Sequence, residues 1–157
     1  LTLEAATNDL VLSVRRDVTL EDAAIRGSRE VAVRSLRDLT MRNAEMSASE
    51  LATLKAAKNL YVDGLNFNKD LPRIVMEATT IRLMNVDFPA NAAVNLNSLK
   101  GPIDGRYPNF GTNLPPAQEL GRVNFLRNVK AGGNLMLDRA TFDQFGGKIS
   151  IGKLPTP

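Results

Sequence analysis

Apolar residues recur at a constant interval through residues 9–97. Four segments align without gaps and begin 21 residues apart, at Val18, Leu39, Leu60 and Ile81. Inside each segment apolar and polar residues alternate, and this period of two predicts strands with one buried face. A further apolar column precedes the segments and holds Leu12, Val33, Leu54, Val75 and Leu96. Self-similarity at a fixed period predicts a solenoid of stacked coils, each 21 residues long.

One position between the paired strands of each coil holds residue types that tolerate a positive φ. Its occupants are Asp22, Asn43, Gly64 and Asn85. Glycine has no Cβ, and the short side chains of Asn and Asp bond locally, so all three enter the left-handed region. We therefore predict that these residues are structural corners, where two short strands meet while both keep their apolar side chains inward.

The predicted fold is all-β: a right-handed, single-stranded parallel β-helix with three strands per coil. Successive coils should stack about 4.8 Å apart, so that each column becomes a row of touching side chains. The handedness follows because crossovers between parallel strands are almost always right-handed. The whole chain should form one domain of roughly six coils, with regular coils over about 9–97, a loop insertion over about 98–121 and final coils over about 122–152.

Residues 47–58 would also suit a helix. They begin with Ser47 in a capping-box-like position, which is typical of a helix N-terminus. However, Ala52 and Leu54 fall in register with apolar residues of the previous coil. The repeat therefore favours a strand over a helix.

The regular period ends after residue 97. Glycine and proline are dense over residues 98–121, which predicts a surface loop outside the tube. Residues 134–142 then match residues 59–67 position for position, with Arg139 at the corner. Arg139 departs from the residue types of the other corners, so the pattern does not define the turn geometry of that coil.

Composition excludes several kinds of chemistry. The chain has no Cys and no His, which excludes Ser-His-Asp and Cys-His catalysis and His-bound zinc. The 20 basic and 17 acidic residues give a net charge of +3, too balanced to imply nucleic acid. No run of 18 apolar residues occurs, so we expect no membrane insertion. We expect neither a cofactor nor a metal.

The repeat also stacks basic side chains in columns. Arg16, Arg37 and Lys58 form one column and are the candidate ligand-binding residues, and Ser13, Arg34 and Lys55 form another column. Arginine matches carboxylates with two hydrogen bonds, so a basic column could bind an acidic polysaccharide. Neutralisation by neighbouring acidic residues on a solvated wall is the alternative that we favour. The loop adds two aromatic candidates, Tyr107 and Phe110.

Two carboxylates could form a catalytic pair. Asp17 and Asp38 should lie one coil apart, about 4.8 Å, a spacing near that of a retaining glycosidase pair. Each follows an arginine directly and lies at a coil corner, where a solvated ladder is the commoner arrangement. We therefore assign no catalytic residue and expect a protein that is not an enzyme.

The coil segments 18–23 (Val-Thr-Leu-Glu-Asp-Ala) and 39–44 (Leu-Thr-Met-Arg-Asn-Ala) resemble the right-handed β-helical repeats of large exported bacterial surface proteins, such as filamentous-haemagglutinin-type adhesins and autotransporter passengers. Residues 94–111 and 121–125 resemble the end of the repeat region in very long bacterial proteins with a FecR-like domain. The resemblance implies an exported protein at a Gram-negative cell surface, and it transfers no catalytic residue. The start at Leu1 fits a piece of a longer chain.

The sequence favours the first of three functions, and the other two are alternatives. The first is a structural or adhesive module of a larger exported surface protein, without chemistry of its own. The second is a β-helix that binds or cleaves polysaccharide. The third is a self-assembling module that forms filaments through its coil ends, because open strand edges pair readily.

Overall fold

The computed structural model describes residues 1–98, 106–107, 112–113, 124–136 and 142–153. All its regular elements over these residues are strands, and they form a parallel β-solenoid of about 5 turns. The strands are β1 (Thr2–Glu4), β2 (Leu10–Val14), β3 (Val18–Glu21), β4 (Ala24–Arg26), β5 (Glu30–Ser35), β6 (Leu39–Ser47), β7 (Leu51–Ala56), β8 (Asn59–Phe67), β9 (Arg73–Ala78), β10 (Thr80–Asp87), β11 (Ala93–Ser98), β12 (Arg106–Tyr107), β13 (Thr112–Asn113), β14 (Asn124–Met136) and β15 (Phe142–Lys153).

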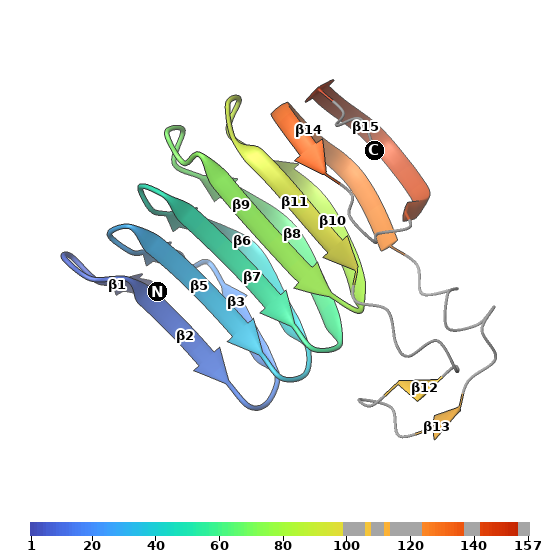
Figure 1. Cartoon of the computed structure of the whole chain (residues 1–157), viewed down its shortest axis with the longest axis horizontal. Coiled ribbons are helices and arrows are strands. Elements are labelled where there is room, and N and C mark those ends of the chain that lie inside the picture. Colours follow the sequence, from blue (N-terminus) through green and yellow to red (C-terminus); the bar gives the residue numbers. More distant parts are fainter. Residues whose placement is uncertain (99–105, 108–111, 114–123, 137–141, 154–157) are drawn as a thin grey trace.

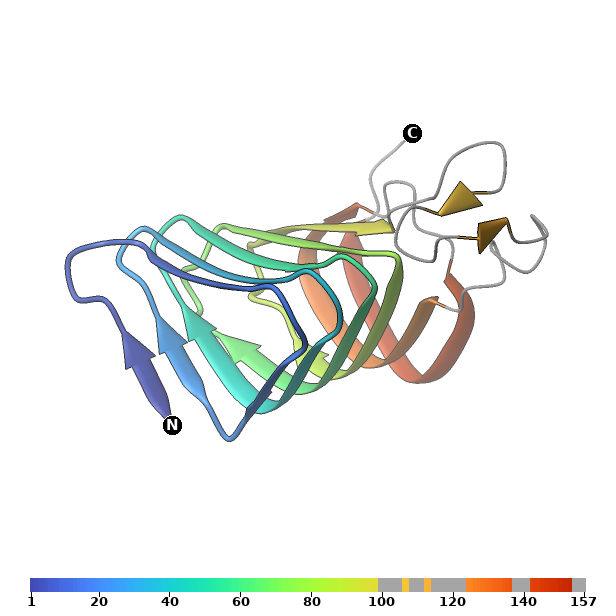
Figure 2. The same ribbon diagram turned by 90° about the horizontal axis from the view of Figure 1, so that it is seen from below.

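The solenoid has three walls of parallel strands. The first wall joins β3 to the N-terminal halves of β6, β8 and β10, and the second joins β1 and β4 to their C-terminal halves. The third wall consists of β2, β5, β7, β9 and β11. Third-wall strands run downward in front and first-wall strands run upward behind as the coils advance from left to right, so the coil is right-handed (Figure 1). Figure 2 shows the same tube from below.

The predicted corners are confirmed. Asp22, Asn43 and Asn85 have φ values of 49°, 48° and 54°, and Gly64 has φ 86°. In β6 and β8 the pairing continues on both sides of the corner, so the chain changes wall within one strand. The corner therefore redirects the strand without breaking the ladder that joins successive coils.

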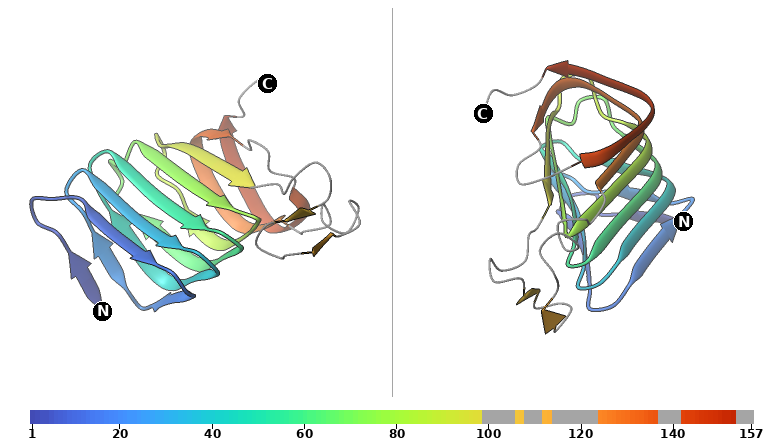
Figure 3. Two further views of the ribbon diagram at one scale, coloured as in Figure 1. Left: turned by 60° about the horizontal axis from the view of Figure 1, so that its bottom comes forward. Right: turned by 90° about the vertical axis from the view of Figure 1, so that its right-hand side faces the viewer.

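The interior is filled by the predicted apolar columns. Leu39, Leu60 and Ile81 are fully buried and pair directly across β6, β8 and β10. Another column ends in two stacked aromatic rings, Phe67 and Phe88, whose centroids are 5.7 Å apart. The right-hand view of Figure 3 looks toward the tube from its C-terminal side and shows the coils arranged around this common interior. Stacking of like side chains thus gives each coil its core.

Residues 51–56 form the strand β7, as the repeat predicts, and not a helix. Ala52 pairs with Val31, and Leu54 pairs with Val33. Both Ala52 and Leu54 are 1% exposed, so this strand belongs to the wall and contributes to the core.

The apolar column of the third wall, which begins at Leu12, differs from the prediction at one coil. Leu54 pairs with Met76, which is 22 residues away, and Met76 then pairs with Leu96 after only 20. Met76 is fully buried, whereas Val75 is only half-buried and faces outward. The turn before β9 is one residue longer than in the previous coil, and the turn after it is one shorter. A slip of one residue reverses the direction of every side chain in β9.

The late coils also differ from the prediction. β14 pairs with β10 so that Val129 lies opposite Val86, which places residue 128 opposite the corner Asn85. The predicted match of residues 134–142 to residues 59–67 is therefore wrong, because residues 135 and 136 pair with β11 on the third wall. β14 thus covers more of one coil than expected, and the solenoid has about 5 turns where the sequence suggested roughly six.

Within the predicted loop, only two short strands are described beyond residue 98. β12 and β13 pair antiparallel, with Tyr107 opposite Thr112, and they belong to a separate two-stranded sheet. The Gly- and Pro-rich segment therefore contains a short hairpin-like pairing that the sequence did not predict. The rest of the proposed insertion lies outside the described residues.

Candidate functional site

The basic column predicted as a ligand site lies at the turn from the third wall to the first. Arg16 and Arg37 are exposed. Lys58 is half-buried and has interaction partners within the fold. The Arg37 Nε lies 3.6 Å from Asp17 Oδ1, and both side chains are about half exposed. An exposed ion pair of this kind contributes about 0–1 kcal/mol. The column is thus partly neutralised by its acidic neighbour.

The acidic residues beside this column hold successive coils together. The Asp38 N–H donates to Asp17 Oδ1 at 3.0 Å. One coil further, the Asn59 N–H and its Nδ2 both donate to Asp38 Oδ1, at 3.2 and 3.0 Å. Because the carboxylates accept bonds from the next coil's backbone, they have a structural use that explains their 21-residue spacing.

Similar contacts cross the other corners. Asn43 Nδ2 donates to Asp22 Oδ1 at 2.5 Å, and Asn85 Nδ2 donates to Asp63 Oδ1 at 2.8 Å. At the turn into the third wall, the Glu30 N–H donates to Asp9 Oδ1 at 3.1 Å. Polar side chains at the corners are therefore used repeatedly to align one coil on the next.

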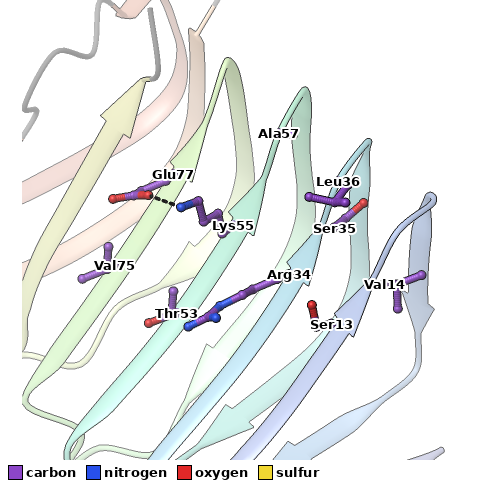
Figure 4. Close-up of a pocket in the computed structure, with 10 residues that line it drawn as sticks. All are labelled: Ser13, Val14, Arg34, Ser35, Leu36, Thr53, Lys55, Ala57, Val75 and Glu77. Carbon is purple, nitrogen blue, oxygen red and sulfur yellow. Dashed lines mark ion pairs between the residues drawn. The ribbon is translucent and has the colours of Figure 1, made fainter. Parts of the chain in front are cut away.

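A hollow among the described residues lies on the outer face of the third wall. This wall groove has a volume of about 410 Å³ and crosses β2, β5, β7 and β9 (Figure 4). Its lining residues are Ser13, Val14, Arg34, Ser35, Leu36, Thr53, Lys55, Ala57, Val75 and Glu77. A smaller hollow of about 260 Å³ lies on the first wall, around Arg42, Tyr61 and Asp63.

The parallel register brings the polar residues of the wall groove together. Arg34 lies opposite Ser13 on one side and Lys55 on the other, and Lys55 lies opposite Glu77. Lys55 Nζ is 3.5 Å from Glu77 Oε2, which forms an ion pair within the groove. The Arg34 side chain extends toward Thr53 (Figure 4). Among the described residues no carboxylate forms an ion pair with Arg34.

Apolar side chains border this polar row. Leu36 is 62% exposed, although it directly follows the β5 strand, and Val75 is half-buried on the outer face. Beyond β9, Asn95 lies opposite Val75 and Asn97 lies opposite Glu77. The amide oxygens of both asparagines are buried and accept no hydrogen bond from the described residues. The accessible part of the groove therefore ends near β9.

Sequence reasoning noted the Ser13, Arg34 and Lys55 column but did not select it. The periodic alignment places the three residues in one column, yet it assigns the wrong face to Val75 and Glu77. The signal that could have found the groove is the β9 sequence itself, because strict periodicity would bury Arg73 and Glu77 inside the tube. Burying two unpaired charges is costly enough to reject that register.

The remaining candidates are not placed in this groove. Tyr107 lies in β12, and Phe110 lies outside the described residues. In the part of the chain that the structure describes, no group of three or more Asp, Glu, His or Cys side chains is arranged to hold a metal ion. The same residues include no helix that is long and apolar enough to cross a membrane.

No known protein family, curated protein or solved structure matches this chain. The β-solenoid is established by the register of the chain's own strands, and its role is inferred from its own residues and geometry.

Proposed function

We propose that the chain is a structural and adhesive module of a large exported bacterial surface protein, without catalytic activity. The observation that carries this proposal is the use of polar corner residues to join coils. Asp17 and Asp38 each accept a backbone N–H from the following coil. Side chains that could have formed a catalytic pair are thus engaged in coil stacking. A rigid tube with a solvated outer surface suits a stalk that presents contacts away from a cell.

Adhesion is tested by displaying the chain on a Gram-negative cell through an outer-membrane anchor. Displaying cells should adhere to coated surfaces more than cells that carry the anchor alone. A Leu54→Asp variant is the matched control, because this side chain is 1% exposed and a buried charge should unfold the wall. Equal adherence of all three strains would contradict the proposal.

Absence of catalysis is tested separately. The purified chain is incubated with acidic and neutral polysaccharides, and new reducing or unsaturated ends are measured. We expect no turnover. Asp17→Asn and Asp38→Asn are suitable probes, since asparagine keeps an acceptor oxygen and already occupies this column at Asn59. Turnover that either substitution abolishes would show that the carboxylates are catalytic.

Self-assembly is a second candidate, and the observation that favours it is the outer edge of β2. Among the described residues, β2 pairs only with β5, so no described strand lies at its other edge. The inward residues Leu10 and Leu12 are only partly buried, whereas Val31 and Val33 in the next coil are fully buried. A second copy that stacked on this edge would cover them. Light scattering should then rise with concentration, and a Leu12→Lys substitution should abolish the rise. A chain that stays monomeric at high concentration would exclude this candidate.

A further inference from the structure

The wall groove combines charge, hydroxyl groups and apolar surface in a line along the tube. Its lining residues include two cations and one carboxylate, Arg34, Lys55 and Glu77, so the groove has one positive charge in excess. Lys55 and Glu77 pair with each other, which leaves the Arg34 guanidinium as the cation without a carboxylate partner among the described residues. Ser13 and Thr53 flank it with hydroxyl groups.

We infer that this groove binds a linear, carboxylate-bearing polysaccharide, with Arg34 as the carboxylate-binding residue. The inference rests on the proposed adhesive role, because it names what the module adheres to. A guanidinium presents two parallel N–H groups that match a carboxylate, which a point charge such as an ammonium does not. The hydroxyl groups of Ser13 and Thr53 can donate to and accept from sugar hydroxyls.

The shape of the groove favours an extended ligand. It crosses four strands, and three strand spacings of about 4.8 Å give a length of about 14 Å. Leu36 and Val75 supply apolar surface at its borders, against which the C–H faces of sugar rings can pack. The ligand therefore lies along the tube axis, across the strands.

A glycan fits this face better than an acidic peptide does. The backbone N–H and C=O groups of β5 and β7 are already paired with their neighbours in the parallel wall. An extended peptide recognised by strand addition needs a free sheet edge, and the face of the wall offers side chains only. Recognition on this face is by guanidinium and hydroxyl groups, which suits carboxylates and sugar hydroxyls.

The test is isothermal titration calorimetry of the whole chain with an oligomannuronate hexamer. Mannohexaose is the matched neutral ligand, because it lacks only the carboxylates, and hexaglutamate is the acidic peptide control. Binding of the uronate hexamer should exceed binding of both controls by at least tenfold. The Arg34→Gln substitution should lower the affinity about tenfold or more, and Arg34→Lys should restore only part of it.

Two further variants distinguish binding in the wall groove from general electrostatic attraction to the chain. Arg26→Gln removes the same charge from the second wall, outside the groove, and should leave the affinity within about twofold. Glu77→Gln removes the groove carboxylate and releases Lys55, so it should raise the affinity several-fold, a gain that misfolding would not give. Equal losses from Arg26→Gln and Arg34→Gln, equal binding of hexaglutamate, or no effect of Glu77→Gln would each overturn the inference. If displaying cells still adhere and the Arg34→Gln variant adheres equally, the groove assignment fails while the adhesive role stands.

Discussion

Replacing the corner residue Asn43 by valine tests how the walls are joined. Asn43 has φ 48°, in the left-handed region. An L-residue there costs about 1–2 kcal/mol, and a β-branched residue is a stronger outlier still. The substitution also removes the exposed hydrogen bond from Asn43 Nδ2 to Asp22 Oδ1, which contributes at most about 0.5–1.5 kcal/mol.

A glycine at the same position separates these two effects. Asn43→Gly loses the same hydrogen bond but has no Cβ, so it has no steric cost at this φ. Its greater freedom in the unfolded chain costs about 0.5–1 kcal/mol. Subtracting that cost from the strain leaves Asn43→Val less stable than Asn43→Gly by about 0–1.5 kcal/mol, toward the upper end because valine is β-branched. At Thr40, in the extended part of the same strand, the order should reverse, because valine favours strands and glycine weakens them.

Urea unfolding followed by circular dichroism measures all four variants. With a slope of about 1–3 kcal/mol per molar urea, a difference of 1 kcal/mol moves the midpoint by about 0.3–1 M. The reversal of order between the two positions is the decisive result. A valine variant at position 43 that is at least as stable as the glycine variant would refute the corner geometry.

Three further sets of substitutions test the register of β9, the tight turn at Gly27 and the hydrogen bond that Asp38 accepts from Asn59. Met76→Ala should cost about 2–5 kcal/mol in urea unfolding and Val75→Ala less than about 1 kcal/mol, whereas a strict 21-residue register would give the opposite order. Gly27→Ala should destabilise the fold by about 1–3 kcal/mol in thermal or urea melts, because an added Cβ would lie 2.1 Å from the Glu30 carbonyl oxygen; an unchanged midpoint would contradict that packing. Asp38→Ala should cost about 0.5–1.5 kcal/mol while Asp38→Asn is nearly neutral, and equal losses in both would mean that charge, not the hydrogen bond to Asn59, is what matters.

The repeat was enough to predict the fold because several independent signals agree at each coil. Asn43 and Gly64 occupy a column whose residue types tolerate positive φ, and both adopt it. Leu39 and Leu60 occupy a column that must be apolar, and both are fully buried. Side-chain alternation, corner chemistry and a fixed period thus specify the same strands, so one weak position does not mislead the prediction.

The late coils could not be predicted in the same way. Arg139 lacks the corner chemistry of Asn43, and only the match of residues 134–142 to an earlier coil supported placing it at a corner. Apolar residues at alternating positions occur in strands of the first wall and of the third wall alike, so such a segment matches the two walls about equally well. Pairing between strands distant in sequence decides the register, as β14 does when Val129 aligns with Val86.

The groove itself depends on the break in the period before β9. With a spacing of 21 residues, Lys55 would lie opposite Met76, and the third wall would present Ile74 and Met76 to solvent. The longer turn before β9 makes the spacing 22, so that Glu77 lies opposite Lys55 and pairs with it at 3.5 Å. Because that pair engages Lys55, Arg34 is left as the groove's cation without a carboxylate partner among the described residues. A single added residue in a turn therefore both keeps Met76 in the core and determines the charge pattern on the outer face. Shortening that turn by one residue should remove both the burial of Met76 and the pairing of Lys55 with Glu77.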